Sequence, residues 1–324
     1  MEKIKTGVIG VGHLGRQHAR IYSELKNVDL IGVADIDEEQ AKSIALKTGA
    51  RAYTDFHELI DKVQAVSIVT PTIEHHRVAK AFLEAGVHVM VEKPITTNVE
   101  EAEELIRLAD RNACILQVGH LERFNAAVQK VVTMITEPKF IECNRLSPFP
   151  ERSMDVDVVL DLMIHDLDII LSLVQSKITS IQAVGIPVLS DRIDIANARV
   201  EFESGCVANV TSSRISLKRE RKIRIFQPPS SYISLNYLKQ EVYAYHKQHN
   251  AKDPHGRPKI VGGKVKVKKT EPLKAELIAF LDAVATESEP LVSGIQAVEA
   301  LKVVKQVQQE IKSRNEKYTI GSYR

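Results

Sequence analysis

The sequence predicts a two-domain protein: an α/β domain built on a parallel sheet, followed by an α+β domain with an open, mainly antiparallel sheet. The first 120 residues alternate apolar runs with helical stretches of about a dozen residues, a pattern typical of βαβ units. After residue 120 the apolar runs follow one another through short turns, which favours antiparallel pairing. The length of 324 residues suits about two domains. We expect these domains at residues 1–121 and 122–324.

The strands of the first domain are near-continuous apolar runs, as in a sheet that is covered on both faces. We expect them at Ile4–Ile9, Val28–Ala34, Ala65–Val69, Val87–Val91 and Ile115–Gly119. Helices are expected between them, at His13–Leu25, Glu38–Thr48, Glu74–Ala85 and Val99–Asn112. Gly86 directly follows the third helix, where a glycine is a stop signal.

The second domain begins with two helices on either side of a strand, at Phe124–Thr136, Phe140–Leu146 and Val156–Val174. The remaining strands are expected at Ile178–Val184, Ile195–Phe202, Cys206–Ser212, Lys222–Phe226, Tyr232–Asn236 and Val242–His246. The stretch 247–269 has few large apolar residues and several Gly, Pro and Lys, which predicts an exposed, mobile connection. Helices at Leu273–Thr286 and Gly294–Ser313 close the chain.

The composition excludes several classes of protein. Lys plus Arg is 44 and Asp plus Glu is 42, whereas a general nucleic-acid binder usually has a large basic excess. No apolar run reaches the ~20 residues of a membrane span, and the N-terminus enters a strand without the apolar stretch of a signal peptide. Cys114, Cys143 and Cys206 are too few for a disulfide framework. We expect a soluble cytoplasmic protein with no nucleic-acid or membrane partner.

A glycine-rich turn joins the first predicted strand to the first predicted helix. Its sequence has the form G-x-G-x-x-G: Gly10-Val11-Gly12-His13-Leu14-Gly15. In this context the pattern is a dinucleotide fingerprint of a Rossmann domain. Gly10 permits the tight turn, Gly12 lets the backbone approach a pyrophosphate, and Gly15 allows close packing. The N-terminus of the helix then attracts the phosphates. A glycine-rich turn without a ligand is the alternative.

Asp35 ends the second predicted strand, 20 residues after the last glycine of the turn. Its carboxylate suits the ribose hydroxyls of a dinucleotide and would repel a 2′-phosphate. Three more acidic residues follow, with no arginine close by: Asp37, Glu38 and Glu39. The sequence therefore predicts NAD rather than NADP.

Two short motifs follow predicted strands: Thr70-Pro71 and Glu92-Lys93-Pro94. Ligands of open α/β sheets lie at the carboxyl ends of the strands. We therefore expect Thr70 and Pro71 beside the cofactor, and Lys93 at its reacting end. A solvated loop lysine is the alternative for Lys93.

Asp161 and His165 are four residues apart, on one face of the predicted helix Val156–Val174. The residues around them are apolar, so both polar groups need a partner or a function. A carboxylate that orients an imidazole suits general acid–base chemistry near neutral pH. The alternative is a polar pair that packs two domains together. Asp166 and Asp168 fall on other helix faces and are expected at the surface or between domains.

Two further features have simpler interpretations. His75 and His76 are adjacent, but neighbouring helical side chains point in different directions, so no metal site is expected. Six basic residues lie close together in the sequence: Arg214, Lys218, Arg219, Arg221, Lys222 and Arg224. They predict a solvated strand edge, and one or two of these charges would suit a nucleotide diphosphate.

These motifs together resemble the Gfo/Idh/MocA family of oxidoreductases, over the whole chain. The resemblance implies that Lys93, Asp161 and His165 correspond to the family's Lys–Asp–His catalytic group. It also implies further cofactor-binding residues at His75, Glu92 and Lys93. By the same resemblance, the segment 119–125 and the strand end at 144–145 line the substrate pocket, with these candidate substrate-binding residues: Glu122, Arg123, Asn125, Asn144 and Arg145.

Within the family, the stretch 155–169 and the run 119–125 are similar to the branch that oxidises C3 of UDP-N-acetylglucosamine. The residues Val158-Val159-Leu160 stand where many members have glycines, which leaves the catalytic spacing intact. We expect NAD-dependent oxidation of a sugar hydroxyl, C3 of a UDP-N-acetylhexosamine, to a 3-keto sugar nucleotide. The alternatives are a dehydrogenase of a free polyol or sugar of the inositol or glucose type, and a non-catalytic NAD-binding sensor.

Assembly and partners follow from the open sheet and from the family resemblance. An uncovered sheet of this size is an aggregation hazard, and apolar residues are expected on its two faces: Val207, Val210, Ile233 and Leu235. We expect a homodimer or homotetramer that packs through the sheets. A 3-keto sugar nucleotide would also suit a pyridoxal-phosphate aminotransferase that acts next.

Overall fold

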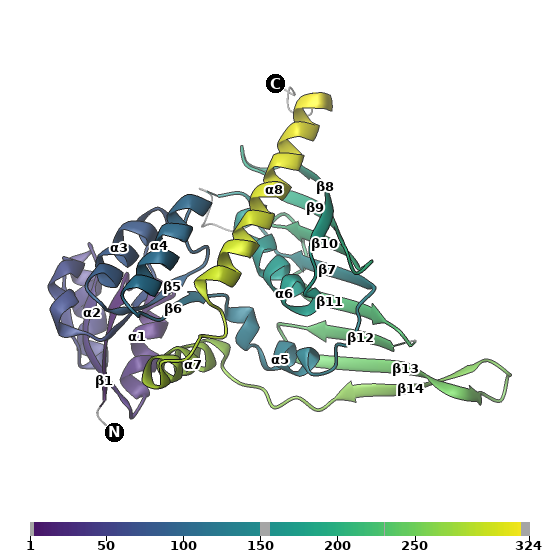
Figure 1. Ribbon diagram of the computed structural model, residues 1–324, viewed down its shortest axis with the longest axis horizontal. Coiled ribbons are helices and arrows are strands. Elements are labelled where there is room, and N and C mark those ends of the chain that lie inside the picture. The colour runs from purple at the N-terminus through teal and green to yellow at the C-terminus, as the bar shows by residue number, and fades with distance from the viewer. Residues whose placement is uncertain (1–2, 150–155, 230, 319–324) are drawn as a thin grey trace. The chain divides into compact units, whose positions relative to one another are not determined.

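The computed structural model describes residues 3–149, 156–229 and 231–318 (Figure 1). Contacts between Cα atoms divide the chain into two compact units: unit 1, residues 1–121 and 271–299, and unit 2, residues 122–270 and 300–324. Residues 271–299, expected in the second domain, therefore belong with the first. The reason is the apolar face of α7 (Pro272–Thr286). Leu277 and Phe280 of this helix are buried in the same core as Val8 and Ile21.

Unit 1 contains a six-stranded parallel sheet with the strand order β3-β2-β1-β4-β5-β6. This confirms the parallel sheet that the βαβ pattern predicts. The third strand was not predicted, because its three residues include an arginine and form no apolar run. The strands are β1 (Ile4–Ile9), β2 (Val28–Ala34), β3 (Arg51–Tyr53), β4 (Ala65–Ile68), β5 (His88–Glu92) and β6 (Leu116–Gly119).

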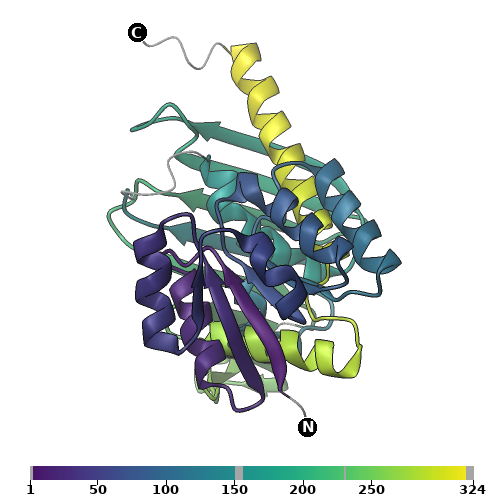
Figure 2. The same cartoon turned by 90° about the vertical axis from the view of Figure 1, so that its left-hand side faces the viewer.

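Helices pack against this sheet (Figure 2). They are α1 (Gly15–Glu24), α2 (Glu38–Thr48), α3 (Thr72–Glu84) and α4 (Val99–Arg111), with the 3₁₀ segment η1 (Phe56–Lys62) after β3. Asp37 and Asn98 begin α2 and α4 as N-caps, since each side chain accepts a hydrogen bond from a backbone amide three residues ahead. Gly49 ends α2 in the left-handed conformation. Local capping chemistry thus fixes where these helices begin and end.

Unit 2 contains an eight-stranded sheet with the order β14-β13-β12-β11-β7-β10-β9-β8. Only the neighbours β7 and β10 pair in parallel, and the other pairs are antiparallel. This confirms the open, mainly antiparallel sheet. The strands are β7 (Phe140–Leu146), β8 (Ile178–Ile186), β9 (Ile195–Phe202), β10 (Val207–Ser213), β11 (Glu220–Gln227), β12 (Ser231–Asn236), β13 (Glu241–Lys252) and β14 (Pro258–Val265).

The expected exposed connection at 247–269 is instead a long hairpin at the edge of this sheet, formed by the end of β13 and by β14. Its backbone pairs although its side chains are mostly polar. An edge hairpin needs no apolar face for its hydrogen bonds, and lysines on an edge strand discourage pairing with other chains. The composition therefore predicted the exposure of this segment correctly and missed its two paired strands.

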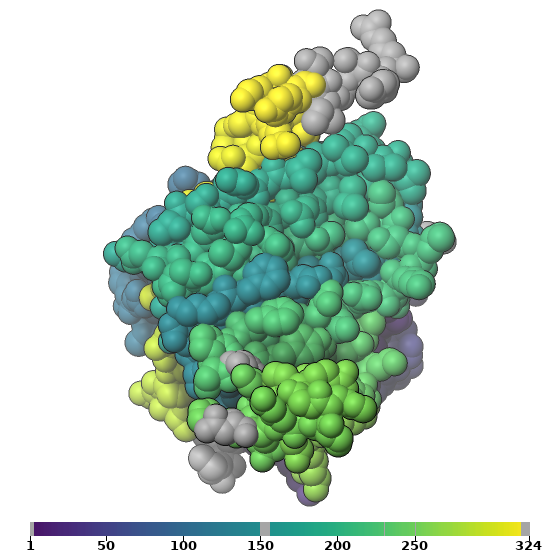
Figure 3. All heavy atoms as spheres, turned by 90° about the vertical axis from the view of Figure 1, so that its right-hand side faces the viewer, coloured from purple at the N-terminus to yellow at the C-terminus, as the bar shows by residue number. Residues whose placement is uncertain are grey.

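Helices cover one face of the second sheet: α5 (Ala126–Val132) contacts β12 and β13, and α6 (Ile164–Val174) contacts β7 and β10. Side chains of β7 alternate between buried positions such as Ile141 and half-buried ones such as Phe140. The half-buried set forms the other face, which Figure 3 shows and which no described helix covers. The last helix is α8 (Gly294–Tyr318). Among the described helices, none is long and apolar enough to span a membrane.

Candidate cofactor pocket and catalytic side chains

Three glycines shape the turn between β1 and α1. Gly10 has a φ of +81°, and a Cβ there would lie 2.7 Å from the carbonyl oxygen of Val69. A Cβ on Gly15 would lie 1.8 Å from the carbonyl oxygen of Gly10. The Cβ position of Gly12 has no described atom within 4 Å. Gly10 and Gly15 therefore close the turn, whereas Gly12 leaves space beside its backbone, which is the arrangement that a pyrophosphate requires.

The first turn of α1 presents backbone amides that no side chain caps. Leu14 precedes the helix and makes no capping hydrogen bond, and the first turn contains no acidic residue. Nearby, Nη2 of Arg16 lies 3.0 Å from Nδ1 of His13. The amides of Arg16 and Gln17 donate to the backbone carbonyls of Gly12 and Leu14, at 3.2 and 2.8 Å, and the N-terminus of the helix keeps its partial positive charge. It therefore fits an anionic group such as a phosphate.

Asp35 ties this turn to the end of β2. Its Oδ2 accepts a hydrogen bond of 2.8 Å from the amide of Val11 and one of 3.0 Å from Nε2 of Gln40. Its Oδ1 accepts a hydrogen bond of 3.0 Å from the amide of Asp37. A carboxylate has about four acceptor positions, so capacity remains for one hydroxyl. The side chain thus holds the turn and still faces the space beside it.

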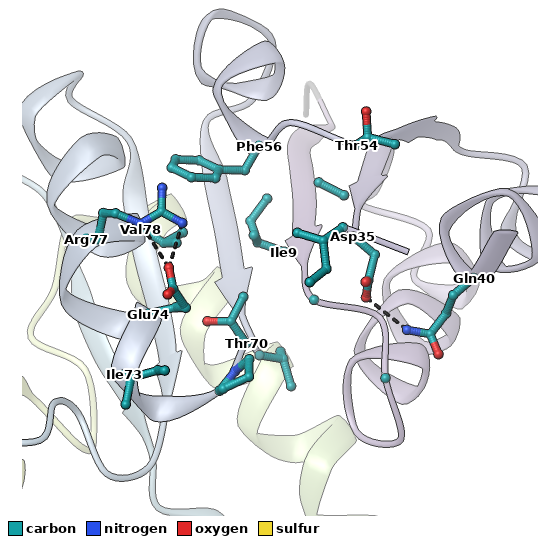
Figure 4. A pocket seen from close by; sticks show the side chains of 16 residues that line it. Ile9, Asp35, Gln40, Thr54, Phe56, Thr70, Ile73, Glu74, Arg77 and Val78 are labelled. Atoms are coloured by element: carbon teal, nitrogen blue, oxygen red, sulfur yellow. Dashed lines mark hydrogen bonds and ion pairs between the residues drawn. The ribbon is translucent and has the colours of Figure 1, made fainter. Parts of the chain in front are cut away.

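A cavity of about 680 Å³ lies between the glycine turn, the end of β2 and the start of α3 (Figure 4). Figure 4 shows Asp35 and Gln40 on one side and Glu74 and Arg77 of α3 on the other. Five of the predicted cofactor residues line the cavity: Gly10, Gly12, Asp35, Thr70 and Pro71. Val11, His13, Leu14 and Gly15 belong to the turn beside it.

Other lining residues were not predicted: Ile36, Gln40, Thr54, Phe56, Ile73, Glu74, Arg77 and Val78. Two of them are large apolar side chains with high exposure, Ile36 at 96% and Ile73 at 75%. Such exposure suits a flat apolar group that a ligand brings. Ile36 directly follows Asp35, and Ile73 lies two residues after Pro71. Both therefore lie close to predicted carboxyl ends of strands, and this position was the signal available in the sequence.

His75 holds two loops of the sheet edge together. Its ring nitrogens lie 2.9 Å from the carbonyl oxygen of Pro94 and 3.0 Å from that of Thr70. The side chain is buried, and burial lowers the pKa of His75 although the two carbonyls favour the protonated ring. His75 is thus a link between the Thr70-Pro71 and Glu92-Lys93-Pro94 motifs. Neither His75, Glu92 nor Lys93 is among the described residues that line the cavity.

Asp161 and His165 share a partly exposed stripe in unit 2. Between residues 158 and 170 every side chain is buried except those of Asp161, Leu162 and His165. Asp161 lies in a π-helical turn, η3 (Val159–Met163), which continues into α6, rather than in one regular helix as predicted. Such π-turns are frequent at functional sites. The stripe keeps both side chains partly exposed on a segment that is otherwise packed into the core, with Nδ1 of His165 turned to the buried side.

Two contacts fix the start of this segment. Oδ1 of Asp157 accepts hydrogen bonds from the amides of Val159 and Leu160, and its Oδ2 accepts one of 2.7 Å from Gln308. The amide of Val158 donates to the carbonyl of Ile193. Asp157 therefore satisfies two backbone amides at the start of the π-turn that carries Asp161, one residue before its N-cap Val158.

A buried ion pair holds the chain just before this cap. Nε of Arg214 lies 2.8 Å from Oδ1 of Asp194, and its Nη1 donates to the carbonyl of Val156. Burial alone would raise the pKa of Asp194, but hydrogen bonds from Val188, Ser190 and Arg214 hold it well below its usual value. Arg214 is only 1% exposed, so the prediction of a solvated strand edge is wrong for this member of the basic run.

Three of the five predicted substrate residues belong to one buried network, and their contact with a substrate stays a prediction. Arg145 contacts both oxygens of Asp166, at 2.8 and 3.1 Å, and lies 3.4 Å from Oε1 of Glu122. Nδ2 of Asn125 donates to Oε2 of Glu122 at 3.1 Å. The guanidinium of Arg145 also stacks over the ring of Tyr237, at 5.4 Å. These groups satisfy one another and brace α6, the helix that carries His165.

The other two predicted substrate residues lie elsewhere. Asn144 is on the face of β7 opposite to Arg145, so the two cannot line one pocket from the same face. Nη1 of Arg123 lies 3.9 Å from Oδ1 of Asp168. Asp166 and Asp168 were expected at the surface or between domains; they are 1% and 3% exposed, so the surface alternative is wrong. Each is buried because an arginine from elsewhere in unit 2 pairs with it.

Comparison with known proteins gives matches along most of the chain. The family described as "Oxidoreductase family, NAD-binding Rossmann fold" (GFO_IDH_MocA) matches residues 4–120. The family described as "GFO/IDH/MocA C-terminal domain" matches residues 134–227. UDP-N-acetylglucosamine 3-dehydrogenase of Acidithiobacillus ferrooxidans is 38% identical over 308 residues, which are 95% of this chain and 97% of that protein.

Solved structures and a further curated relative also match this chain. The structure of UDP-N-acetylglucosamine 3-dehydrogenase GnnA from A. ferrooxidans matches with a TM-score of 0.91 and 37% identity, over 97% of this chain and 99% of that one. Inositol 2-dehydrogenase of Rhodococcus jostii is 32% identical, over 55% of this chain and 52% of that protein. A levoglucosan dehydrogenase in complex with NADH has the same fold, with a TM-score of 0.84 and 18% identity over 96% and 98% of the two chains.

Proposed function

Since the chain belongs to the GFO/IDH/MocA family of NAD-binding oxidoreductases, we propose that it oxidises C3 of a UDP-N-acetylhexosamine to a 3-keto sugar nucleotide. The observation that carries this proposal is the likeness to UDP-N-acetylglucosamine 3-dehydrogenase over nearly the full length of both chains. Inositol dehydrogenases match over 55–69% of the chain with 25–32% identity, which gives the free-polyol alternative less support.

The cofactor NAD supplies the hydride acceptor, and the residues of unit 1 fit it. The open space at Gly12 and the uncapped α1 suit the pyrophosphate. Asp35 has acceptor capacity for a ribose hydroxyl and would repel a 2′-phosphate. The exposed side chains of Ile36 and Ile73 suit the two faces of an adenine. His75 would hold the Thr70 loop in place beside the bound dinucleotide.

We assign the proton chemistry to Lys93, Asp161 and His165, by analogy with the family's Lys–Asp–His group. His165 removes the hydroxyl proton as general base, and Asp161 orients its ring and stabilises the imidazolium. Lys93 polarises the hydroxyl oxygen and stabilises the negative charge that develops on it, or shares the proton relay. The accessible stripe that Asp161 and His165 share supports these roles.

A spectrophotometric screen for NADH tests the function. We expect turnover with UDP-N-acetylglucosamine or UDP-N-acetylgalactosamine, and little with N-acetylglucosamine, myo-inositol or glucose. Equal or faster turnover of a free sugar would favour the polyol alternative. Tight NAD binding without NADH production from any of these compounds would favour the sensor.

We further propose a homodimer or homotetramer that packs through the open face of the second sheet. An aromatic row crosses four neighbouring strands on that face: Phe140, Phe226, Tyr232 and Tyr245. The ring centres of successive members are 5.8, 5.1 and 6.2 Å apart. Of the apolar residues that were expected to be available, Val210, Ile233 and Leu235 are buried, whereas Val207 is half-buried.

Two further proposals concern the setting of the reaction. A 3-keto sugar nucleotide is a carbonyl compound that a pyridoxal-phosphate aminotransferase accepts, so we propose such an enzyme as the next in sequence. We also propose a cytoplasmic location, because the three cysteines Cys114, Cys143 and Cys206 are all free thiols and thiols stay reduced there.

A further inference from the structure

His18, on the buried side of α1, faces the motif that contains Lys93. Its side chain is 0% exposed, and its Nε2 lies 3.3 Å from Oε1 of Glu92. Neither ring nitrogen makes a hydrogen bond within the part of the chain that the structure describes. A buried imidazole needs a polar partner, and the Glu92 carboxylate is close enough to be that partner after a small rotation.

Glu92 has little freedom to move away from His18. Glu92 lies at the end of β5 and is only 8% exposed. A Cβ on Gly119 would lie 2.8 Å from its carboxyl carbon and 2.9 Å from each of its oxygens. The carboxylate therefore fills the space that the missing side chain of Gly119 leaves on the neighbouring strand.

The same carboxylate contacts the backbone of Lys93. The amide of Lys93 donates a hydrogen bond of 3.3 Å to Oε2 of Glu92. One oxygen of Glu92 thus faces His18 and the other holds Lys93. The direction in which the Lys93 side chain leaves the backbone depends on this amide, because a small rotation of the peptide is amplified along a four-carbon chain.

We propose that His18 is a positioning residue for Lys93: it holds the Glu92 carboxylate, which in turn fixes the backbone at Lys93. The catalytic consequence rests on the function proposed above, whereas the positioning concerns only contacts within unit 1. A role in stability alone does not account for the arrangement, since a buried polar pair contributes little stability compared with apolar residues of similar size. His18 lies against the carboxylate that binds the Lys93 amide, and this points to a role in orienting Lys93.

The experiment compares three variants. His18→Leu removes the polar ring, and His18→Gln keeps a hydrogen-bond donor. Tyr22→Phe is the matched control, because Tyr22 lies one turn later on the same helix, is also 0% exposed, and makes a buried hydrogen bond of 2.8 Å to Ser67. The two readouts are hydrogen exchange at the Lys93 amide, and kcat together with the Kd for NAD.

We expect His18→Leu to speed exchange at the Lys93 amide about tenfold, and His18→Gln and Tyr22→Phe to leave it within about threefold. With the sugar that the wild type oxidises best, kcat should fall about tenfold in His18→Leu, because small displacements of a catalytic group are costly. The Kd for NAD should change less than about threefold.

Unchanged exchange at Lys93 in folded His18→Leu would overturn the proposal. So would an equal change in Tyr22→Phe, which would indicate general loosening of α1, or an unchanged kcat. If His18→Leu does not fold, Glu92→Leu, which removes both carboxylate oxygens, is measured instead, with the same expectations for exchange at the Lys93 amide and for kcat. If the wild type oxidises no sugar, the proposed function fails, and the exchange measurement alone decides whether His18 positions Lys93.

Discussion

The amide of Val11 donates a hydrogen bond of 2.8 Å to Oδ2 of Asp35. The carboxylate at the end of β2 is therefore bound to the backbone of the glycine turn. One side chain both shapes the place of the pyrophosphate and presents negative charge where a ribose would lie. We therefore expect the affinity for both cofactors to depend on the hydrogen bond from Val11 to Asp35. The choice between NAD and NADP should depend on the charge of Asp35.

Wild-type protein should bind NAD at least about tenfold more tightly than NADP, a difference of ~1.4 kcal/mol. Asp35→Asn keeps the size of the side chain and removes the charge that repels a 2′-phosphate, so it should narrow this ratio. Asp35→Ala also removes the acceptor of the Val11 amide, so it should weaken both cofactors. Isothermal calorimetry with both dinucleotides measures these differences.

Gln40→Ala is the matched control, because it removes one partner of Asp35 and leaves the carboxylate and the Val11 contact in place. It should change NAD affinity less than either Asp35 variant. The assignment of Asp35 would be wrong if the wild type bound NADP as tightly as NAD.

Lys93→Ala and His165→Ala should each lower kcat by roughly 10²–10⁴, the usual range for a positioned acid–base group. NAD affinity should stay within a few-fold, because neither residue lines the described cofactor cavity. Asp161→Asn should have a smaller effect, since it removes charge and keeps shape. The double variant should lose less than the product of the single losses, because residues that act as a unit are non-additive.

A purely structural role for Asp161 and His165 has a different outcome. Their substitution would then lower the melting temperature and leave turnover of the folded fraction nearly unchanged. Measuring kcat, NAD affinity and Tm on the same preparations separates the two roles. Near-wild-type turnover in folded His165→Ala would remove this histidine from the mechanism.

The parts of the fold that local patterns determine were predictable. Apolar runs gave most of the strands, and the glycine turn gave the place of the cofactor pocket. Short or interrupted strands were not predictable in this way: β3 has three residues, and the apolar residues of β14 are separated by two glycines and a lysine. Their pairing depends on backbone hydrogen bonds to neighbouring strands, which the side-chain pattern does not record.

Contacts between residues that are far apart in the sequence could not be predicted either. Arg145 pairs with Asp166 and Arg214 with Asp194 in the buried interior of unit 2. Each residue alone resembles a surface charge, because burial of either depends on its partner. The lining residues of the candidate cofactor cavity were missed because they are far apart in the sequence. Ile36 and Arg77 come from different elements, and only the fold places them around one cavity.

Stability should depend on pH through Asp194. The pKa of this carboxyl is depressed in the folded protein, so its contribution is complete above the unfolded value of about 4 and is lost as the pH falls below it. Asp194→Asn should cost about 3–5 kcal/mol at neutral pH, since it leaves the buried Arg214 without its charged partner. The difference in Tm from the wild type should shrink as the pH falls from about 5 to 3.

Asp253→Asn is the control for this prediction. Hydrogen bonds from the amides of Arg257 and His255 also lower the pKa of Asp253, but its partner Arg257 has a side chain that is 72% exposed. An exposed pair contributes only about 0–1 kcal/mol. Equal effects of the two substitutions, or a difference for Asp194→Asn that is independent of pH, would contradict the argument.

The aromatic row on the open sheet face should determine assembly. Phe226 lies in the middle of this row and is 37% exposed in the single chain. Phe226→Lys places a charge among aromatic rings, which should dissociate a dimer or tetramer that packs through this face. Leu217→Lys is the matched control, because Leu217 is a fully exposed apolar residue outside the row.

Light scattering at micromolar concentration should show an oligomer for the wild type and for Leu217→Lys, and a smaller species for Phe226→Lys. A wild-type monomer would show that the open face needs no partner, and an unchanged oligomer in Phe226→Lys would place the interface elsewhere.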